Sequence, residues 1–266
     1  MIVNSVLKGV RVVGDRTLKI VERVGATVAF LGLILVNSAT SLKRPSLIVR
    51  EVYYAGVQSL IIILVSGLFV GMVLGLQGHE TLQKYGSEES VGVLVALALV
   101  REMGPVVSAL LFASRAGSAI TAEIGLMKAT EQLSAMEMMA VSPVARVVAP
   151  RFWGGVLSMP LLALLFSSMG IFGGFVVAVV LIGVDNGAFW SQMQAAVDFR
   201  QDVVNGIIKS LVFGVAVSAI ATFEGYEAPP TAEGVSGATT RTVVTSSLAI
   251  LALDLLLTAF MLKGWN

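Results

Sequence analysis

The sequence predicts an all-α polytopic membrane protein, and two observations predict this class. Of the 266 residues, 56% are hydrophobic and only 13% are charged, whereas a soluble domain carries about 25% charged residues. Long apolar segments also recur along the chain, and five of them are long enough to cross a hydrocarbon layer about 30 Å thick. The net charge is only +1, so we expect no nucleic acid among the partners.

The composition also excludes several kinds of site. The chain has no cysteine and one histidine, which excludes disulfides and thiolate metal sites and disfavours a histidine metal site. It contains neither a GxxxxGK[ST] loop nor a GxGxxG motif after a strand, and it therefore shows no means of binding a nucleotide by itself. We expect no catalytic residue, no metal and no cofactor bound by this chain, and so no enzyme activity of its own.

Residues 1–45 are predicted to form an interfacial or re-entrant element on the cytoplasmic side. Their first half, NSVLKGVRVVGDRTLKIVERV, alternates aliphatic and basic residues at helical spacing, which is typical of an amphipathic helix in the membrane interface. The apolar run Val24–Val36 is short, and basic residues at Arg23, Lys43 and Arg44 disfavour translocation of either end. A sixth span is one alternative. A signal peptide is another, although the basic region is too long for it.

Residues 46–266 are predicted to form one transmembrane domain with about five spans. The predicted spans are Leu60–Leu76 (extended upstream from Val49), Val91–Ala113, Phe152–Val184, Val203–Phe223 and Thr242–Leu262. The third is long enough to tilt strongly or to run past the bilayer. Between the third and fourth spans, Trp190 and Phe199 indicate an interfacial helix.

Charge asymmetry predicts the orientation. Residues 1–50 hold eight basic residues against two acids, and the connection 115–151 holds four basic residues, whereas the loops after the first and third spans hold only Lys84 and Arg200. By the positive-inside rule the N-terminus and the 115–151 connection are cytoplasmic. Five spans then place the C-terminus on the other side. The segment 224–240 falls on the cytoplasmic side although it is acidic.

The cytoplasmic connection contains a short predicted helix. Thr130 is positioned to cap a helix that begins at Glu131, and the pair Ser142-Pro143 ends it. Its methionines suit a surface that adapts to a groove. The helix either packs under the bundle or docks as a coupling helix into a soluble partner. The residues that we expect to carry such docking are Glu131, Gln132, Met136, Glu137, Met138 and Met139.

Four ionisable residues lie within the predicted spans. They are Arg101, Glu102, Lys209 and Asp254, and each such group costs at least about 2.5 kcal/mol inside a bilayer. Pro105 has no N–H, so the carbonyl of Arg101 loses its usual donor and we expect a polar, kinked break in the second span.

Three interpretations of these charges are open. In the first they form ion pairs that fix the packing of the spans, with Lys209 near Glu102 or Asp254. In the second Arg101 and Lys209 contact a phosphate head group, which suits the guanidinium fork, and Glu102 balances them. A proton relay is the third.

The first span contains Gly67, Gly71 and Gly75 at intervals of four residues. Small residues at this spacing let helices approach closely. The glycine face either packs within one subunit or lies near the axis of a dimer, beside a cavity for acyl chains.

The chain resembles a known family over several long motifs. The run from Arg101 to Trp153, REMGPVVSALLFASRAGSAITAEIGLMKATEQLSAMEMMAVSPVARVVAPRFW, resembles the signature region of the MlaE (YrbE) permease family. The further matches are GMVLGLQG (71–78), FWSQMQAAVDFRQDVVNGIIKS (189–210), EGYEAPPTAEGVSGATTRTVV (224–244) and SSLAILALDLLLTAF (246–260). Members of this family are permease subunits of MCE-type ABC transporters, which move phospholipids between the two membranes of Gram-negative bacteria and maintain outer-membrane lipid asymmetry.

The resemblance implies an assembly in the inner membrane. It implies a homodimer, two copies of a cytoplasmic ABC ATPase that binds ATP-Mg, a periplasmic hexameric ring of MCE-domain protein and a small cytoplasmic STAS-domain protein. The predicted helix Glu131–Ala140 would dock into the ATPase.

The resemblance also implies a phospholipid pocket built by the first, second and fifth spans and open outward, and it therefore favours a position of the glycine face near the dimer axis. The candidate lining residues are Val70, Val73, Leu74, Gln77 and Tyr85, with Arg101, Glu102, Lys209 and Asp254 as polar members.

Two other functions fit the residues alone. An ion-coupled secondary transporter would use the four intramembrane charges, but the sequence shows no inverted repeat. A membrane scaffold would anchor a periplasmic ring without moving anything.

Overall fold

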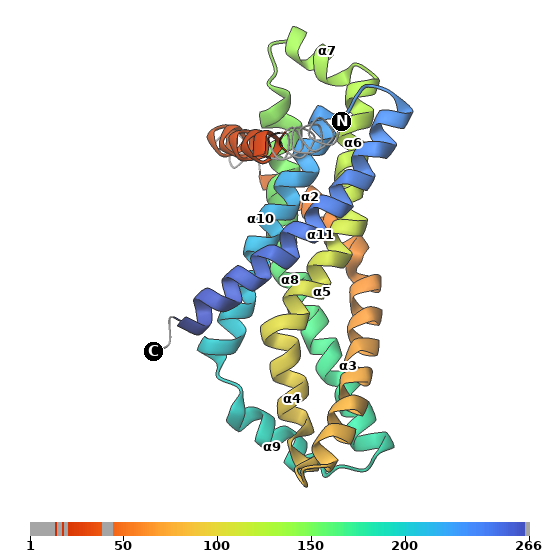
Figure 1. Ribbon diagram of the computed structural model, residues 1–266. Coiled ribbons are helices and arrows are strands. Elements are labelled where there is room, and N and C mark those ends of the chain that lie inside the picture. Colours follow the sequence, from red (N-terminus) through yellow and green to blue (C-terminus); the bar gives the residue numbers. More distant parts are fainter. Residues whose placement is uncertain (1–13, 15–17, 19–20, 39–44, 264–266) are drawn as a thin grey trace, which may run out of the picture.

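The computed structural model describes residue 14, residue 18, residues 21–38 and residues 45–263 (Figure 1). Throughout these residues the ordered elements are helices, which confirms the all-α class. Most of the amphipathic pattern predicted before residue 21, and the basic pair at 43–44, lie outside the described residues. Six described segments are long and apolar enough to cross a membrane, by length and composition: Val21–Ser38, Pro45–Gln83, Glu88–Ala129, Val144–Leu181, Phe199–Glu227 and Ala232–Met261.

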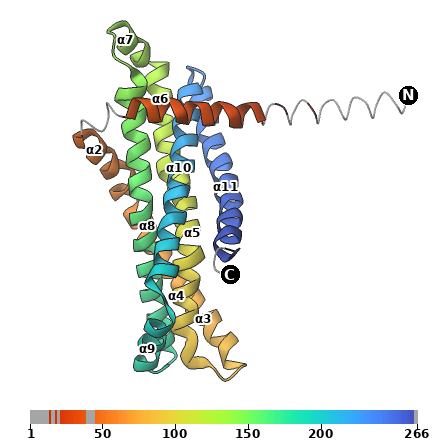
Figure 2. The same ribbon diagram turned by 90° about the vertical axis from the view of Figure 1, so that its left-hand side faces the viewer.

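Five of these segments run along one bundle axis (Figures 1 and 2). Their α-helices are α2 (Pro45–Ala55) with α3 (Leu60–Gln83), α4 (Val91–Ala98) with α5 (Gly104–Phe112) and α6 (Ser118–Ala129), α8 (Ala149–Phe175), α10 (Val204–Glu227) and α11 (Ala232–Lys263). Short 3₁₀ turns stand at Val57–Ser59 (η1) and Glu88–Ser90 (η2). π-helical turns stand at Leu99–Met103 (η3), Ala113–Gly117 (η4), Val144–Val148 (η5), Val176–Leu181 (η6) and Phe199–Val203 (η7).

The helix Val21–Ser38 lies across the bundle, whereas the other five segments run along it (Figure 2). Ile34 is fully buried in a cluster with Phe152, and the indole of Trp153 donates a hydrogen bond to Ser38 Oγ at 2.8 Å. This segment is long enough for the sixth span that the sequence left open. Its crosswise direction is nevertheless the one expected of an interfacial helix.

The two ends of the bundle differ in the elements that they carry. The crosswise helix lies at the same end as α6 and α7 (Gln132–Met138), whereas α9 (Asn186–Ala196) lies at the opposite end (Figure 2). The crosswise helix Val21–Ser38 and the 115–151 connection, which the charge asymmetry assigns to one side, therefore share one end of the bundle.

The helices extend beyond the predicted spans. The second predicted span ended at Ala113, but its helical segment continues to Ala129 and includes Arg115 and Glu123. Arg115 donates hydrogen bonds to Tyr54 O at 2.7 Å and to Gln58 Oε1 at 2.6 Å. Hydropathy marks only the length that tolerates hydrocarbon, whereas a helix continues for as long as its polar side chains find partners or solvent.

The glycine face of α3 packs against α8 within the subunit. A Cβ atom at Gly67 would lie 2.7 Å from the carbonyl oxygen of Phe166, and one at Gly71 would overlap the backbone of Gly170. Gly75 meets Gly174 in the same way, with its Cβ position 3.1 Å from that carbonyl oxygen. The expectation that this face lies beside a dimer axis is therefore wrong, because α8 already covers it.

Gly71→Ala tests this close approach. The added methyl group must displace the α8 backbone, and overpacking of this kind lowers the free energy of unfolding by about 1–3 kcal/mol. We expect a lower midpoint of thermal unfolding in detergent, which size-exclusion chromatography of heated samples would measure. Val65→Ala, on the exposed side of the same helix, is the control and should change little. Equal midpoints for the two variants would contradict this packing.

Candidate functional site

The second span contains the polar break that Pro105 predicts. The chain forms the π-helical turn η3, in which the N–H of Gly104 donates to Leu99 O, five residues earlier. Such a turn absorbs one extra residue and leaves backbone groups without a regular partner. The carbonyl of Arg101, which Pro105 deprives of its donor, instead accepts a hydrogen bond from Lys209 Nζ at 3.2 Å.

Three of the four predicted charges meet at the ammonium group of Lys209. Its side chain is only 3% exposed and lies 2.6 Å from Glu102 Oε2 and 3.2 Å from Asp254 Oδ1. It also donates to Thr258 Oγ1 at 2.7 Å. One buried cation therefore joins the second span, α10 and α11, and both contacts that the ion-pair interpretation offered for Lys209 are present.

The fourth charge, Arg101, pairs with a residue that the sequence analysis missed. Its Nε lies 2.6 Å from Asp202 Oδ1, and Asp202 is buried although Arg101 is half exposed. The other carboxylate oxygen of Asp202 accepts from the backbone N–H of Asp198 at 2.8 Å. Arg101 thus connects η3 to η7, the turn that opens α10.

A small polar pocket of about 190 Å³ adjoins these groups. Its lining residues are Arg101, Glu102, Gln201, Asp202, Asn205, Lys209, Thr258 and Met261. The two cations of the network face three carboxylates, because Asp254 joins Glu102 and Asp202. The cluster therefore satisfies its cations internally, as the ion-pair interpretation requires. A phosphate group would have to bind the Nη groups of Arg101, because these make no hydrogen bond within the described part of the chain.

A second buried carboxylate lies near the other end of α10. Glu224 is buried, 2.6 Å from Arg23 on the crosswise helix and 3.0 Å from Arg241 on α11. These pairs attach the crosswise helix to two bundle helices. They also balance the charge of Glu224, one of the acids that made the segment 224–240 an exception to the positive-inside rule.

The predicted coupling helix is present as α7, with different ends. Glu131 precedes it in the left-handed conformation, with φ of 59°, and Thr130 Oγ1 bonds to Leu126 O at 2.9 Å. Thr130 is therefore not its cap. The helix ends at Met138, and Pro143 begins the next helical segment. The predicted helix Glu131–Ala140 thus starts one residue too early and ends two residues too late, because Glu131 and Ala140 both adopt the left-handed conformation, Ala140 with φ of 58°.

α7 is anchored on one side and exposed on the other. Leu133 is buried in a cluster with Ile124 and Val147, and Met136 packs partly against that cluster. Met138 and Met139 are 85% and 67% exposed. The remaining predicted residues, Glu131, Gln132 and Glu137, are also exposed.

The predicted lipid-pocket residues of the first span lie along the outside of the bundle. Val70 and Leu74 are half-buried against the main core. Val73, Gln77 and Tyr85 are exposed. None of these five residues lines the polar pocket beside the charged cluster.

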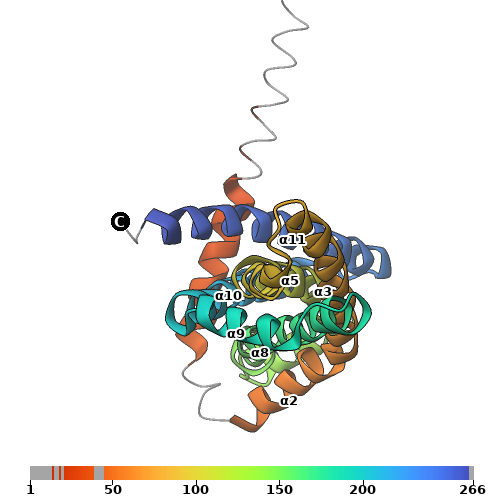
Figure 3. The same cartoon turned by 90° about the horizontal axis from the view of Figure 1, so that it is seen from below.

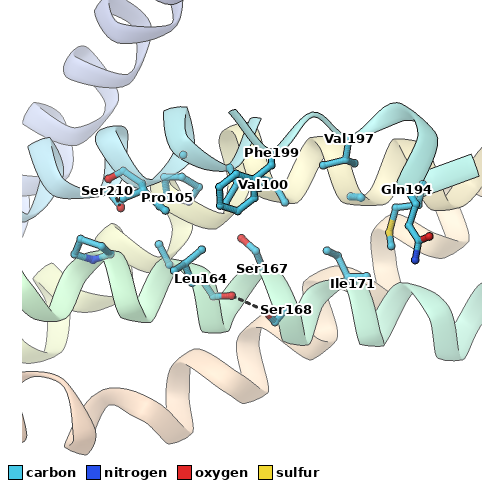
Figure 4. A pocket seen from close by; sticks show the side chains of 17 residues that line it. Val100, Pro105, Leu164, Ser167, Ser168, Ile171, Gln194, Val197, Phe199 and Ser210 are labelled. Carbon is cyan, nitrogen blue, oxygen red and sulfur yellow. Dashed lines mark hydrogen bonds between the residues drawn. The ribbon is translucent and has the colours of Figure 1, made fainter. Parts of the chain in front are cut away.

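A larger apolar cavity of about 410 Å³ lies elsewhere, between the second span, α8, α9 and α10 (Figure 4). None of the predicted lipid-pocket or coupling-helix residues lines it, whereas Pro105 and Phe199, which the sequence analysis named for other reasons, do. The gap depends on how far apart the helices lie, which the apolar pattern of each helix leaves undetermined.

Other residues of the network could have been recognised in part. Thr258 stands four residues after Asp254 on an otherwise apolar helix, and side chains at that spacing share one helix face. Asp202 and Glu224 instead stand at the edges of apolar runs, where acids are common, and they carry no comparable signal.

Comparison with known proteins gives one consistent result. The family described as Permease MlaE matches residues 48–260. The chain is 54% identical to the intermembrane phospholipid transport system permease protein MlaE of Haemophilus influenzae, over 98% of each chain. It is 34% identical to a probable ABC transporter permease protein of Rickettsia typhi, over 94% of this chain and 96% of that one. A probable ABC transporter permease protein of Synechocystis is 36% identical, over 81% of each chain.

Lys209→Met tests the charged cluster. The substitution leaves Glu102 and Asp254 without their shared cation, and removal of one partner from a fully buried pair costs about 3–5 kcal/mol. We expect a loss toward the lower end of that range, because the side chain of Glu102 is 43% exposed. Thermal unfolding in detergent measures it, with Lys84→Met in an exposed loop as the control. A Lys209→Met protein as stable as the control would show that the cluster does not fix the packing.

Proposed function

This chain belongs to the MlaE permease family, and we propose from that premise that it is the permease subunit of an ATP-driven ABC transporter moving phospholipids between the inner and outer membranes. The observation that carries the proposal is the family match over residues 48–260. The same membership favours this function over an ion-coupled secondary transporter, whose relay would need the charges that the structure shows paired with one another.

ATP hydrolysis belongs to a partner ATPase that docks on α7. Leu133 and Met136 fix α7 to the bundle, whereas Met138 and Met139 point away from the core. A rigidly anchored helix with flexible apolar side chains suits insertion into a groove of another protein. Because α6 leads directly into α7, a movement of the ATPase would be transmitted to the second span.

Two copies of the chain form the transporting unit. With its glycine face buried on α8, α3 exposes a row of large apolar side chains at intervals of three or four residues: Ile61, Val65, Phe69, Val73 and Leu76. We assign the phospholipid cavity to the space between two such faces, with Val70, Val73, Leu74, Gln77 and Tyr85 at its wall and mouth. This arrangement retains the predicted pocket residues while the glycines serve packing within each subunit.

The charged cluster supports this cavity mainly as a structural element. Lys209 holds Glu102 and Asp254 at one level, so the second span, α10 and α11 keep their relative positions. The half-exposed Arg101 is the member best placed to meet a phosphate oxygen, because only its Nε is engaged by Asp202.

The remaining partners follow from the family. A periplasmic hexameric ring of MCE-domain protein would lie at the end that carries α9, and a small STAS-domain protein would associate with the ATPase. The chain would lie in the inner membrane of a Gram-negative bacterium, with its N-terminus in the cytoplasm.

Reconstitution tests the proposal as a whole. The purified chain should hydrolyse no ATP, and proteoliposomes containing it with the ATPase and the ring protein should move fluorescent phospholipid only when ATP is present. Transport driven by an ion gradient without ATPase would overturn the proposal.

Met138→Asp combined with Met139→Asp tests the docking surface. Charges placed in an apolar groove should weaken binding of the ATPase at least about tenfold, which corresponds to 1.4 kcal/mol, while the permease remains folded. Co-purification and ATP-driven lipid transport measure the effect. The pair Met138→Leu and Met139→Leu keeps the apolar surface and should behave like the wild type. Full binding by the aspartate variant would place the ATPase elsewhere.

Val73→Trp tests the proposed cavity between two copies. A large ring on this exposed face should reduce phospholipid transport and the amount of phospholipid that co-purifies, because it occupies the space of an acyl chain. Leu157→Trp, at an exposed position on α8, is the control. Unchanged transport by the Val73 variant would contradict the assignment of this face.

A further inference from the structure

The apolar cavity of about 410 Å³ has the size of a ligand site, since pockets for small ligands span about 300–1,000 Å³. Figure 4 shows its length, with Pro105 and Ser210 at one end, Phe199 and Leu164 in the middle and Gln194 at the other end. The charged cluster described above is not part of its wall.

The cavity exists because short side chains and proline rings face one another across it. Ala96 and Pro105 of the second span, Pro160 and Ala163 of α8 and Gly206 of α10 all line the gap. Protein interiors are otherwise packed as densely as organic crystals, so a gap of this size between helices calls for an occupant.

The serine hydroxyls on the wall are already engaged in hydrogen bonds. Ser167 donates to Leu99 O at 3.3 Å, Ser168 to Leu164 O at 2.8 Å and Ser210 to Ile207 O at 2.8 Å. With their hydrogens engaged, these hydroxyls offer a ligand no donor, and a polar ligand would lose its hydration without replacement. The wall therefore selects an apolar occupant.

The continuous segment of η7 and α10 separates this cavity from the polar pocket. Val203, Gly206 and Ile207 line the apolar cavity, whereas Asp202 and Lys209 line the polar pocket. At the boundary a Cβ atom on Gly206 would lie 2.5 Å from the carbonyl oxygen of Val100, so the backbones of α10 and η3 touch. The apolar cavity is thus a distinct space on the opposite side of α10.

The exposed residues at the opening of the cavity belong to long apolar segments, and we therefore expect the opening to face the hydrocarbon of a membrane. Leu164, Ser168 and Phe199 line it and are exposed, and all three belong to segments long and apolar enough to cross a membrane. Gln194, at the end formed by α9, supplies the one exposed amide. One polar end and a long apolar interior match an amphiphile.

The volume argues against a helix of a partner protein as the occupant. A cylinder about 10 Å across with a pitch of about 5.4 Å encloses roughly 420 Å³ per turn, so the cavity would hold only one turn. A single acyl chain is thinner and can follow the cavity from α9 to Pro105.

We propose that this cavity binds one acyl chain of a membrane phospholipid, with the glycerol end near Gln194 and the chain end near Pro105. The site is separate from the cavity assigned between two copies, and it does not depend on whether the protein transports lipid.

Photocrosslinking tests the site in the full-length protein in nanodiscs. The probe is a phosphatidylethanolamine that carries a diazirine near the end of one acyl chain, and mass spectrometry locates the adducts. We expect adducts on Leu164, Val203 and Ile207 that saturate as the mole fraction of probe rises. Adducts that rise linearly, and equally on Leu161 and Phe172 outside the cavity, would show ordinary boundary lipid and overturn the proposal.

Ala163→Phe places a ring inside the cavity, and Leu161→Phe adds the same ring on the exposed side of α8. We expect the first variant to lose its cavity adducts at least about tenfold, because the ring replaces the burial of several methylene groups, and the second to keep them. Ser168→Phe blocks the opening with little change to the interior and decides the question if Ala163→Phe does not fold. Adducts that persist in the folded blocking variant, or that vanish when a partner protein is added to the wild type, would overturn the proposal.

Discussion

The ammonium group of Lys209 is the contact on which the arrangement of three helices depends. It is buried among apolar spans and bonds to Glu102, Asp254, Thr258 and the carbonyl of Arg101. A cation in such a place is tolerated only when it is fully paired. Helix rotations that separate these partners therefore leave an unpaired charge in hydrocarbon, and this restricts how α10 and α11 can turn against the second span.

Backbone contact restricts the opposite side of the bundle. α3 and α8 meet through glycines such as Gly71 and Gly170, so their interface is set by main-chain geometry and tolerates little added volume. One side of the protein is thus held by charge pairing and the other by close packing. Figure 3, viewed along the bundle, shows α11 and α8 on different sides of α5. Rigid elements of this kind would let a movement at α7 reach the middle of the membrane.

The continuous segment of η7 and α10 divides a polar space from an apolar one. Asp202 and Lys209 face the charged cluster, whereas Val203 and Ile207, each one or two residues away, face the apolar cavity. The helix therefore presents two chemically opposite faces within the membrane. In the hydropathy pattern Lys209 is a single charge within an apolar span. In the structure its partners are Glu102 on the second span and Asp254 on α11.

The sequence by itself determined the helical class, the five bundle segments, the separation of α7 and α9 to opposite ends of the bundle and the polar break at Pro105, because these follow from hydropathy, charge counts and the missing proline N–H. It also identified four intramembrane charges, since any such group stands out in an apolar run. Only the tertiary structure decided that Lys209 pairs with both Glu102 and Asp254 and that Arg101 pairs with Asp202. It also decided that α3 packs on α8 at Gly71 and that a cavity lies beside Phe199. Apolar helices specify their rotation weakly, so contacts between segments distant in the chain emerge only when all of them pack at once.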